Sequence, residues 1–592
     1  MKYLTLVQSP PAKPNFQIDK YLDPQLVIPF VILLGVLFFF KGSKKGQLTT
    51  GRLAATTDKA NASNLATKQI KQRKHNKVAF WCGTPKYFFG KKWLLPLHNI
   101  LGNSPSVWFP HAERSSLVLG SPGSGKTYGT IDRLMESCIT QGFPLIVYAK
   151  KEEQMKFVAS FAAKNGYDVR VFAPGEEYSE TINPLDFLKD KEDQVVAGQI
   201  AEVINNNTNG GANKGGDPFF DKAAILLVKA LIQLAKMAES IPGYADCADL
   251  STVSALLKVE DFIKKLDYAI SENHIPRWIA TSFQQYISSI KSERTVASID
   301  TTTVGIFSKF IQKSLLPSFI GPTSIPTNLR GKQILIFKLD DENRDVVGPL
   351  LAASLHMTVV KNLSSPRQDP LGIFLDELPS LFLKSLPQWI NEYRSNGACF
   401  VLGVQSIKQL VDAYGENLAR SIISACSTKV LYNPGDFQTA KEFSDTYGQT
   451  EKVIKNKSVS NNREGRNITI NENLQTMPLI TPDEIMQLPQ GHCIITNPGY
   501  GVSSRMSVPY RLKIFISKAD DARISTCERI WDDVLRDKLI QRRQKQTNYN
   551  GDFNAYMDDQ MNRRDQLAVK LLHPDDEDEI ISSEDEDDSD FY

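Results

Sequence analysis

The stretch from Gly120 to Thr127 constrains this chain most, because it reads GSPGSGKT and matches G-x-x-x-x-G-K-[ST] at every fixed position. Residues 116–119 before it are apolar and predict a buried strand, and residues 128–140 after it predict a helix. In that strand–loop–helix setting, backbone N–H groups and the helix N-terminus surround a phosphate group. A glycine- and serine-rich turn can fit the pattern by chance, but the flanking elements favour a nucleotide site.

The motif gives each of its side chains a role. Lys126 is expected to reach the β- and γ-phosphates, and the Thr127 hydroxyl is expected to bind Mg²⁺. The predicted nucleotide-binding residues are Gly120, Ser121, Gly123, Ser124, Gly125, Lys126 and Thr127.

A second motif is the apolar run 371–375, which ends in the paired acids Asp376 and Glu377. If this run is a parallel strand, Asp376 lies at the carboxyl edge of the sheet near the phosphate loop, where it helps to hold Mg²⁺. Glu377 is then placed to act as the general base that activates water. Taken alone, an apolar run ending in acids is usually a strand that meets solvent. The phosphate loop makes the catalytic interpretation specific.

Another apolar run, 398–404, is flanked by two candidate catalytic residues. Gln405 follows it, where an amide either orients water and senses the γ-phosphate or simply caps the strand end. Arg394 precedes it. This arginine either forms a local salt bridge or reaches a neighbouring subunit's nucleotide as an arginine finger. The sequence leaves both alternatives open.

The remaining pattern predicts an α/β fold with a helical insertion. Strand-like runs at 145–148 and 169–172 alternate with a helical pattern, which indicates a parallel sheet covered on both faces. Residues from about 190 to 290 read as helix throughout. In one of these helices a single apolar face is formed by Phe220, Ala223, Ala224, Leu227, Leu231 and Leu234. The polar stretch 456–476 is expected to be an exposed loop.

The N-terminal region predicts a membrane anchor. Residues 26–40 contain no charge, and as a helix they span about 22 Å, which flanking lysines can extend toward the ~30 Å hydrocarbon core. A buried helix or a signal peptide is the alternative, but lysines follow the run directly and no A-x-A-like site appears. The positive-inside rule places the C-terminal side in the cytoplasm.

Charge is distributed very unevenly, although the formal net charge is only +2. Residues 41–93 contain thirteen Lys or Arg and one acid, a pattern that suits anionic lipid headgroups or, alternatively, nucleic acid. Eleven acids lie between positions 575 and 590, followed by Phe591 and Tyr592. We expect this tail to be disordered, and either to solubilise the chain or to dock on a basic partner. The seven cysteines form no C-x-x-C pair, so free thiols are expected.

In order along the chain, these motifs resemble the TraD/TraG family of type IV secretion coupling proteins, the ATPases that feed DNA into conjugation channels. The resemblance runs from about residue 115 to 497. The matching segments are the phosphate loop, 183–186 (NPLD), 217–220 (DPFF), 375–379 (LDELP), 393–397 (YRSNG), 405–406 (QS), 409–410 (QL), 414–415 (YG) and 478–484 (PLITPDE).

The resemblance implies a fold class of α/β, with a RecA-like P-loop ATPase domain, an inserted all-α domain, an N-terminal transmembrane anchor and a disordered acidic C-terminal tail. It implies ATP and Mg²⁺ as cofactors and a homohexameric ring in the bacterial inner membrane, with the motor domain in the cytoplasm. The implied partners are single- or double-stranded DNA, relaxase and relaxosome proteins, and channel components. The expected division is 1–45 with the span 26–40, a basic juxtamembrane region 46–109, nucleotide-binding parts 110–189 and 291–520, the all-α insertion 190–290, and a C-terminal extension 521–592.

The sequence departs from the family's pattern at two places. The family usually has two transmembrane segments, and one is found here. The family also has an Asp-x-Lys-Gly-Glu signature where this chain has Tyr148-Ala149-Lys150-Lys151-Glu152, so no role is assigned to Lys150. Two other functions stay open: an FtsK/HerA-like DNA translocase, and a docking receptor for protein effectors with little DNA translocation.

Overall fold

The computed structural model describes residues 51–83, 107–208, 210–211, 218–307, 310–462, 465–501, 507–547 and 552–573. The predicted span 26–40 and the acidic tail lie outside these residues, as does part of the basic run 41–93. The described chain divides into two units. The smaller unit contains Gly51 and the hairpin residues Gln449–Met477, and the larger unit contains the described residues of Arg52–Gly448 and of Pro478–Tyr592. Each unit is described by itself.

The larger unit is built on a nine-stranded sheet. From β9 to β5 neighbouring strands run parallel, whereas β12 pairs antiparallel with both β9 and β13. The strands in spatial order are β13 (Tyr510–Lys513), β12 (His492–Thr496), β9 (Thr428–Leu431), β3 (Ser116–Leu119), β8 (Ala398–Val404), β7 (Leu371–Leu375), β4 (Leu145–Ala149), β6 (Gln333–Lys338) and β5 (Asp168–Phe172).

Both faces of this sheet are covered, as the alternating strands and helices predict. In β3 the side chains of Leu117 and Leu119 pack into one apolar cluster while Val118 packs into the other, because successive strand residues face opposite sides. The sheet therefore has a complete core on each face, and its strands read as nearly continuous apolar runs.

Helices and short strands cover these faces. The face on which Val118 lies packs on α4 (Asp132–Thr140), α5 (Glu152–Lys164), β1 (Ala79–Cys82) and β2 (Val107–Pro110). The other face packs on α12 (Arg344–Leu363), α13 (Leu386–Glu392), α14 (Ile407–Tyr414), α15 (Glu416–Ala425), α16 (Phe437–Tyr447) and α17 (Pro482–Met486). All seven cysteines are buried, and each is a free thiol.

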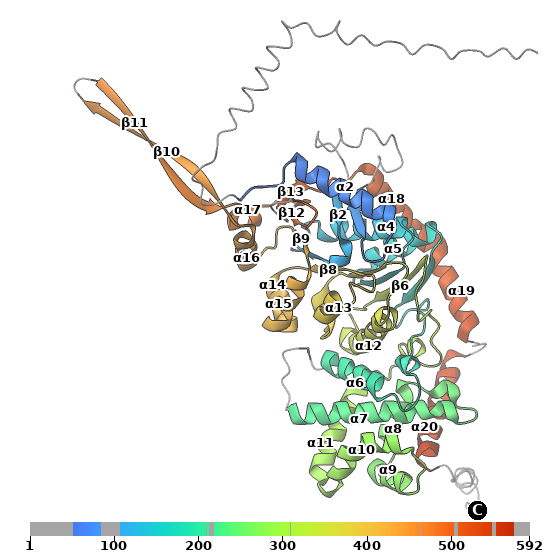
Figure 1. The fold of residues 1–592 in the computed structure, drawn as a ribbon. Helices are drawn as coiled ribbons and strands as arrows, with labels where there is room; N and C mark the ends of the chain where they lie inside the picture. The colour runs from blue at the N-terminus through green and yellow to red at the C-terminus, as the bar shows by residue number, and fades with distance from the viewer. Residues whose placement is uncertain are drawn as a thin grey trace, which may run out of the picture. The chain divides into compact units, whose positions relative to one another are not determined.

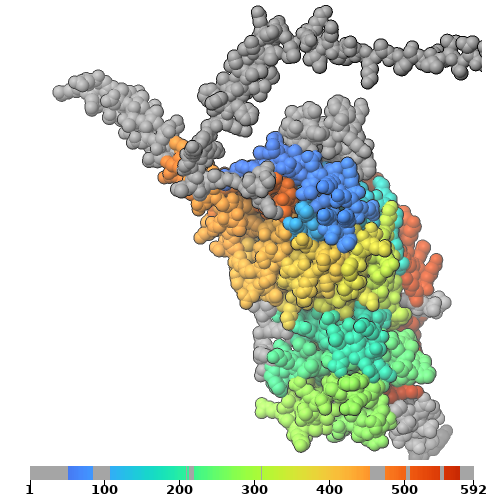
Figure 2. All heavy atoms as spheres, viewed as in Figure 1, coloured from blue at the N-terminus to red at the C-terminus, as the bar shows by residue number. Residues whose placement is uncertain are grey.

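A helical module is inserted between β5 and β6 (Figure 1). Its apolar face on α7 is buried at Ala223, Ala224, Leu227, Leu231 and Leu234, as the helical spacing predicts, and Phe220 is partly buried. The helical run continues to Phe307, beyond position 290. The helices are α6 (Gln194–Thr208), α7 (Pro218–Lys236), α8 (Leu250–Lys258), α9 (Phe262–Ser271), α10 (Arg277–Ser288) and α11 (Glu293–Phe307). In Figure 2 their green atoms form a packed block against the yellow atoms of the sheet part of the same unit.

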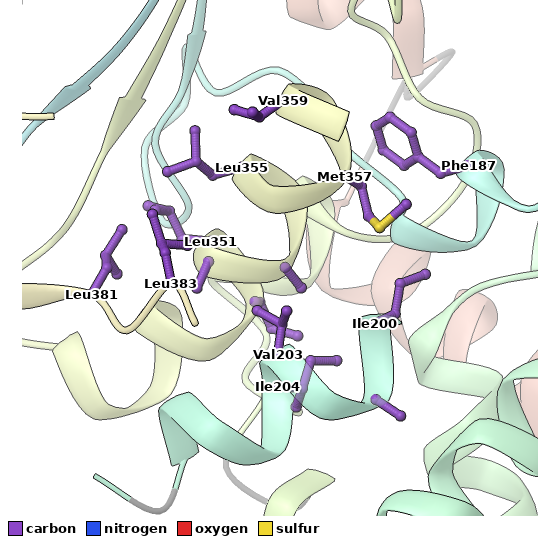
Figure 3. Packing of buried hydrophobic residues seen from close by; sticks show 14 of the residues in the cluster. Phe187, Ile200, Val203, Ile204, Leu351, Leu355, Met357, Val359, Leu381 and Leu383 are labelled. Carbon is purple, nitrogen blue, oxygen red and sulfur yellow. The ribbon is translucent and has the colours of Figure 1, made fainter. Parts of the chain in front are cut away.

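Helix α12 joins this module to the sheet. Leu351 and Leu355 of α12 lie near Leu381 and Leu383, while Met357 lies toward Ile200 of α6 (Figure 3). Within the described chain, α12 is also the helix that is long and apolar enough to cross a membrane, but 83% of its most apolar window is buried. We therefore interpret α12 as a core helix.

The described part of the C-terminal extension is helical. Helix α18 (Lys518–Ile530) leads through a π-helical turn (Trp531–Leu535) to α19 (Arg536–Thr547), and then α20 (Phe553–Leu572) follows. These helices, red in Figure 1, run from α4 and α5 to α8. The extension thus contacts both the sheet and the helical module.

The smaller unit corrects one expectation. Instead of an exposed loop at 456–476, the structure has a hairpin of two long strands, β10 (Gln449–Asn462) and β11 (Gly465–Pro478). The sequence of this segment is mostly polar, so it lacks the sustained apolar alternation by which a half-buried strand is recognised.

Part of the basic run is described, and three of its cations have intramolecular partners. Arg52 Nη1 lies 2.5 Å from Asp58 Oδ2 at the start of α2 (Thr56–Gln72). The Lys59 ammonium lies 4.5 Å from the centre of the Tyr510 ring, and Arg73 lies over a phenylalanine. These cations contribute to the fold, so they are less available to lipid or nucleic acid.

Candidate nucleotide site

The phosphate loop leaves β3 at Gly120 and enters a π-helical turn (Lys126–Ile131) that continues as α4. Gly120 has no room for a side chain. A Cβ there would lie 2.5 Å from Ser124 Oγ and 2.7 Å from Tyr432 Cβ, which is well inside van der Waals contact. The loop is therefore held compactly against β9, and its first fixed glycine is required sterically.

Thr127 and Asp376 meet, as the sequence predicts. Thr127 Oγ1 donates a 2.8 Å hydrogen bond to Asp376 Oδ2, across a separation of 249 residues. Asp376 directly follows β7, so the two residues stand at the carboxyl edges of different parallel strands. A hydroxyl and a carboxylate in contact form an oxygen pair of the kind that holds Mg²⁺ beside a phosphate.

The Lys126 ammonium lies between the two acids, with Nζ 3.5 Å from Asp376 Oδ1 and 3.8 Å from Glu377 Oε1. The side chain is only 6% exposed, and within the described chain its ammonium makes no hydrogen bond. The Ser124 hydroxyl is likewise buried without a partner among the described residues. Buried donors without acceptors are costly, and phosphate oxygens would satisfy both. The residues present therefore fit a nucleotide phosphate.

Glu377 is fixed in both backbone and side chain. Gln405 Nε2 donates a 3.0 Å hydrogen bond to Glu377 Oε2, so the amide that follows β8 orients the predicted base. The Glu377 backbone has φ 57°, a left-handed conformation that is uncommon for a residue other than glycine. Its carbonyl accepts hydrogen bonds from the backbone N–H and the hydroxyl of Ser380. The Ser380 hydroxyl in turn contacts the Tyr148 hydroxyl on β4, at 2.6 Å.

A glycine that sequence reasoning missed supports this arrangement. A Cβ on Gly403 in β8 would lie 2.2 Å from Asp376 Oδ1 and 2.9 Å from Ile131 Cδ1. The bare backbone of β8 therefore makes room for the Asp376 carboxylate. Nothing in the local sequence shows this, because the two strands are neighbours only in the folded sheet.

A buried acid lies beneath the site. Gln154 Nε2 donates to Asp132 Oδ1 at 2.9 Å and approaches Asp376 Oδ2 at 3.4 Å, so it links the two carboxylates. Burial raises the pKa of Asp132 to about 7, and the nearby Asp376 charge adds to the rise, while Gln154 and Arg133 oppose it. Asp132 is thus an ionisable group in the neutral pH range next to the site.

The phosphate loop opens into a pocket of about 800 Å³, which is within the usual range for a small-molecule site. Glu377 and Gln405 line it together with the loop. Three segments that carry no motif also line it: Lys150 and Lys151 after β4, residues 490–491 before β12, and residues 513–516 after β13. Lys150 lies 3.3 Å from Asp341, another lining residue, so the structure brings this lysine to the pocket although the family signature is absent.

Arg394 is not part of this pocket. It lies exposed in the turn after α13, four residues before β8 begins at Ala398. Because Gln405 follows the same strand, Arg394 is at the opposite edge of the sheet from the phosphate loop. The structure therefore gives it no contact with the nucleotide site of its own chain.

The fold is similar to that of solved coupling proteins. The structure of the conjugative coupling protein TrwB without its first 70 residues is 17% identical, with a TM-score of 0.52, and the match covers 69% of this chain and 87% of that one. TrwB in complex with ADP and Mg²⁺ gives a TM-score of 0.51 at 16% identity, covering 69% and 86% of the two chains. At these identities the likeness shows the fold alone.

Sequence relatives agree with the structural likeness. The coupling protein TraD of Escherichia coli (strain K12) is 28% identical over 152 residues, which are 25% of this chain and 21% of TraD. The type IV secretion system-coupling protein VirD4 of Bartonella quintana (strain Toulouse) is 24% identical over 405 residues, 65% of this chain and 61% of VirD4. The model of the type IV secretion-system coupling protein DNA-binding domain matches residues 104–503, more than half of the chain. The chain therefore belongs to the type IV secretion-system coupling protein family.

Proposed function

We propose that this protein is a membrane-anchored ring ATPase that couples ATP hydrolysis to the delivery of DNA, a relaxase-bound plasmid strand, into a type IV secretion channel. The observation that carries the enzymatic part is the Thr127–Asp376 contact of 2.8 Å with the buried Lys126 ammonium beside it. This arrangement supports an NTPase site because it supplies two metal ligands and a phosphate-binding cation within one pocket.

The chain's residues divide the work of hydrolysis. Thr127 and Asp376 would hold Mg²⁺, which when bound neutralises charge on the β- and γ-phosphates. Lys126 binds the phosphate oxygens from the buried side. Glu377 accepts the proton of the attacking water, and Gln405 fixes the carboxylate for that transfer. TrwB has been solved in complex with ADP and Mg²⁺ and with non-hydrolysable ATP and GTP analogues, which supports these cofactors here.

The partners and location follow from the family. Membership supports DNA, relaxosome proteins and channel components as partners, a homohexamer as the assembly, and the bacterial inner membrane as the location, with the motor domain in the cytoplasm. The apolar run 26–40 is the proposed anchor.

The test is an ATPase assay of the purified full-length protein with single-stranded DNA, with double-stranded DNA and without DNA. We expect Mg²⁺-dependent ATP hydrolysis that DNA stimulates, and loss of that hydrolysis in Lys126→Ala. Hydrolysis that no DNA stimulates would instead favour a docking receptor for protein effectors. Absence of both nucleotide binding and hydrolysis in the wild-type protein would refute the proposal.

A further inference from the structure

Phe515 is an exposed aromatic residue on the wall of the nucleotide pocket. Its side chain is 63% exposed, and it lines the same pocket as Lys126. It lies between β13 and α18, far from every motif of the family in sequence. Single exposed apolar side chains are common on protein surfaces, so what indicates a ligand at Phe515 is its place in the lining of the nucleotide pocket.

The segment before Phe515 is tied to the phosphate loop by backbone hydrogen bonds. The Gly491 N–H donates to the Ser124 carbonyl at 2.9 Å, and the Ile514 N–H donates to the Gly491 carbonyl at 2.9 Å. Two backbone hydrogen bonds therefore connect the phosphate loop, through Gly491, to Ile514, the residue before Phe515. These bonds fix the backbone beside Phe515 relative to the loop.

The segment after Phe515 is fixed as well. Ser517 caps α18 with a reciprocal pair of hydrogen bonds to Asp520. Tyr128, which follows the phosphate loop, donates a 2.5 Å hydrogen bond to Asp521 Oδ1. With both flanks held, the exposure of Phe515 reflects a defined position of the backbone.

The pocket has room for more than phosphates. Its volume is about 800 Å³, and Lys513, Ile514, Phe515 and Ile516 line it together with the phosphate loop. A nucleobase is flat and apolar on its faces, and an aromatic ring is the side chain that stacks on it most favourably.

We propose that Phe515 forms the base subsite, stacking on the nucleobase of the nucleotide that the phosphate loop binds. This inference rests on the proposed nucleotide-binding function. Stacking does not distinguish one base from another, because every base has a π-face. The subsite therefore accepts adenine and guanine nucleotides alike, and it contributes affinity for the nucleoside part without contacting the phosphates.

The test measures binding by titration calorimetry on the full-length chain, with Mg²⁺ present, using ATP, GTP and inorganic tripolyphosphate as separate ligands. Phe515→Ala should weaken ATP and GTP about tenfold, within the range for loss of one stacked base, and leave tripolyphosphate binding unchanged. Phe515→Trp should retain ATP binding, and relative to the wild-type protein its added tryptophan emission should change with ATP but not with tripolyphosphate. Phe437→Ala is the matched control, because Phe437 is 56% exposed at the start of α16, away from the pocket.

The outcomes separate the subsite from the function on which it rests. If Lys126→Ala abolishes ATP binding while Phe515→Ala binds ATP as the wild-type chain does, the base subsite is wrong and the nucleotide site stands. If Phe515→Ala weakens ATP and tripolyphosphate equally, the ring supports the loop and does not stack, which also overturns the inference. If the wild-type chain binds neither ligand, the proposed function fails and the subsite fails with it.

Discussion

Glu377 shows at the scale of one residue how this site is prepared. Its left-handed backbone costs about 1–2 kcal/mol for a residue with a Cβ, and the hydrogen bonds from Ser380 hold it in place. That conformation turns the chain just after β7, so that the carboxylate faces Gln405 and the Lys126 ammonium. Strain of this kind is typical of catalytic positions.

The first prediction concerns this carboxylate. Glu377→Gln should bind ATP with nearly normal affinity and hydrolyse it about 10²–10⁴-fold more slowly, because it keeps the shape but loses the proton acceptor. Nucleotide binding and steady-state hydrolysis, measured on the same preparation, separate the two effects. Turnover close to that of the wild-type protein would show that Glu377 is not the base.

The second prediction concerns pH and Asp132. Its pKa is about 7 in the folded chain against an ordinary value of 3.8, so between these values the folded state binds more protons than the unfolded state. The free energy of unfolding therefore falls as the pH rises from about 4 to about 7. Asp132→Asn removes this pH-dependent decrease in the free energy of unfolding. At pH 8 the variant should therefore be more stable than the wild-type protein by up to about 4 kcal/mol.

Thermal unfolding from pH 5 to pH 8 measures the effect, and the stability gap between variant and wild type should shrink toward pH 5. Asp558→Asn is a suitable control, because its side chain is 71% exposed and its replacement should shift stability little at any pH. A gap for Asp132→Asn that stays constant with pH would contradict the assigned ionisation.

At the scale of elements, the C-terminal extension connects the two parts of the larger unit. Helix α18 is attached to α4 by Arg523, whose Nη1 lies 2.7 Å from Glu136 Oε1. Helix α20 is attached to the helical module by Arg564, whose Nη2 lies 2.5 Å from Asp249 Oδ2, with both side chains fully buried. Asp249 also caps α8 by accepting two backbone hydrogen bonds, so this one carboxylate organises two helices.

The third prediction compares two adjacent arginines of α20. Arg564→Ala should lower the free energy of unfolding by about 3–5 kcal/mol, because it leaves Asp249 buried without its partner. Arg563→Ala should cost less than about 1 kcal/mol, since its ion pair with Asp246 is partly exposed. Denaturant unfolding and the rate of proteolysis within α20 measure the effect of each substitution. Equal effects of the two substitutions would mean that burial of the Arg564 pair does not matter to stability.

At the scale of the whole molecule, the parallel sheet places the candidate catalytic residues at two opposite edges. The phosphate loop, Asp376 and Gln405 follow their strands and stand at the carboxyl edge, whereas Arg394 precedes β8 and stands at the other. An arginine that far from its own site can act on a nucleotide only across a subunit boundary. The finger in a neighbouring subunit and a local structural role both stay open for Arg394.

The fourth prediction tests this in the proposed hexamer. Arg394→Ala should bind ATP normally and fail to hydrolyse it, because the transition-state charge loses its partner from the neighbour. Mixing Arg394→Ala with Lys126→Ala subunits should recover some hydrolysis, since at one kind of mixed interface an intact site meets an intact arginine. No recovery in rings shown to be mixed would make Arg394 a structural residue.

The sequence by itself determined the chemistry at the phosphate loop and at the strand ends. Lys126, Thr127, Asp376 and Glu377 were predictable because each follows a buried run, and the carboxyl ends of parallel strands meet at one edge. The helical insertion was predictable in the same way, since a 3.6-residue apolar period is a local property of the chain.

Only the tertiary structure decided the contacts between distant segments. Three such contacts depend on how the elements pack. They are the approach of Gly403 to Asp376, the backbone hydrogen bonds that hold the segment before Phe515 at the phosphate loop, and the pairing of Arg564 with Asp249 across 315 residues. The hairpin at 449–478 escaped prediction because its mostly polar sequence carries no sustained apolar period. The local sequence pattern shows which side chains of a segment are buried. It does not show against which distant segment they pack.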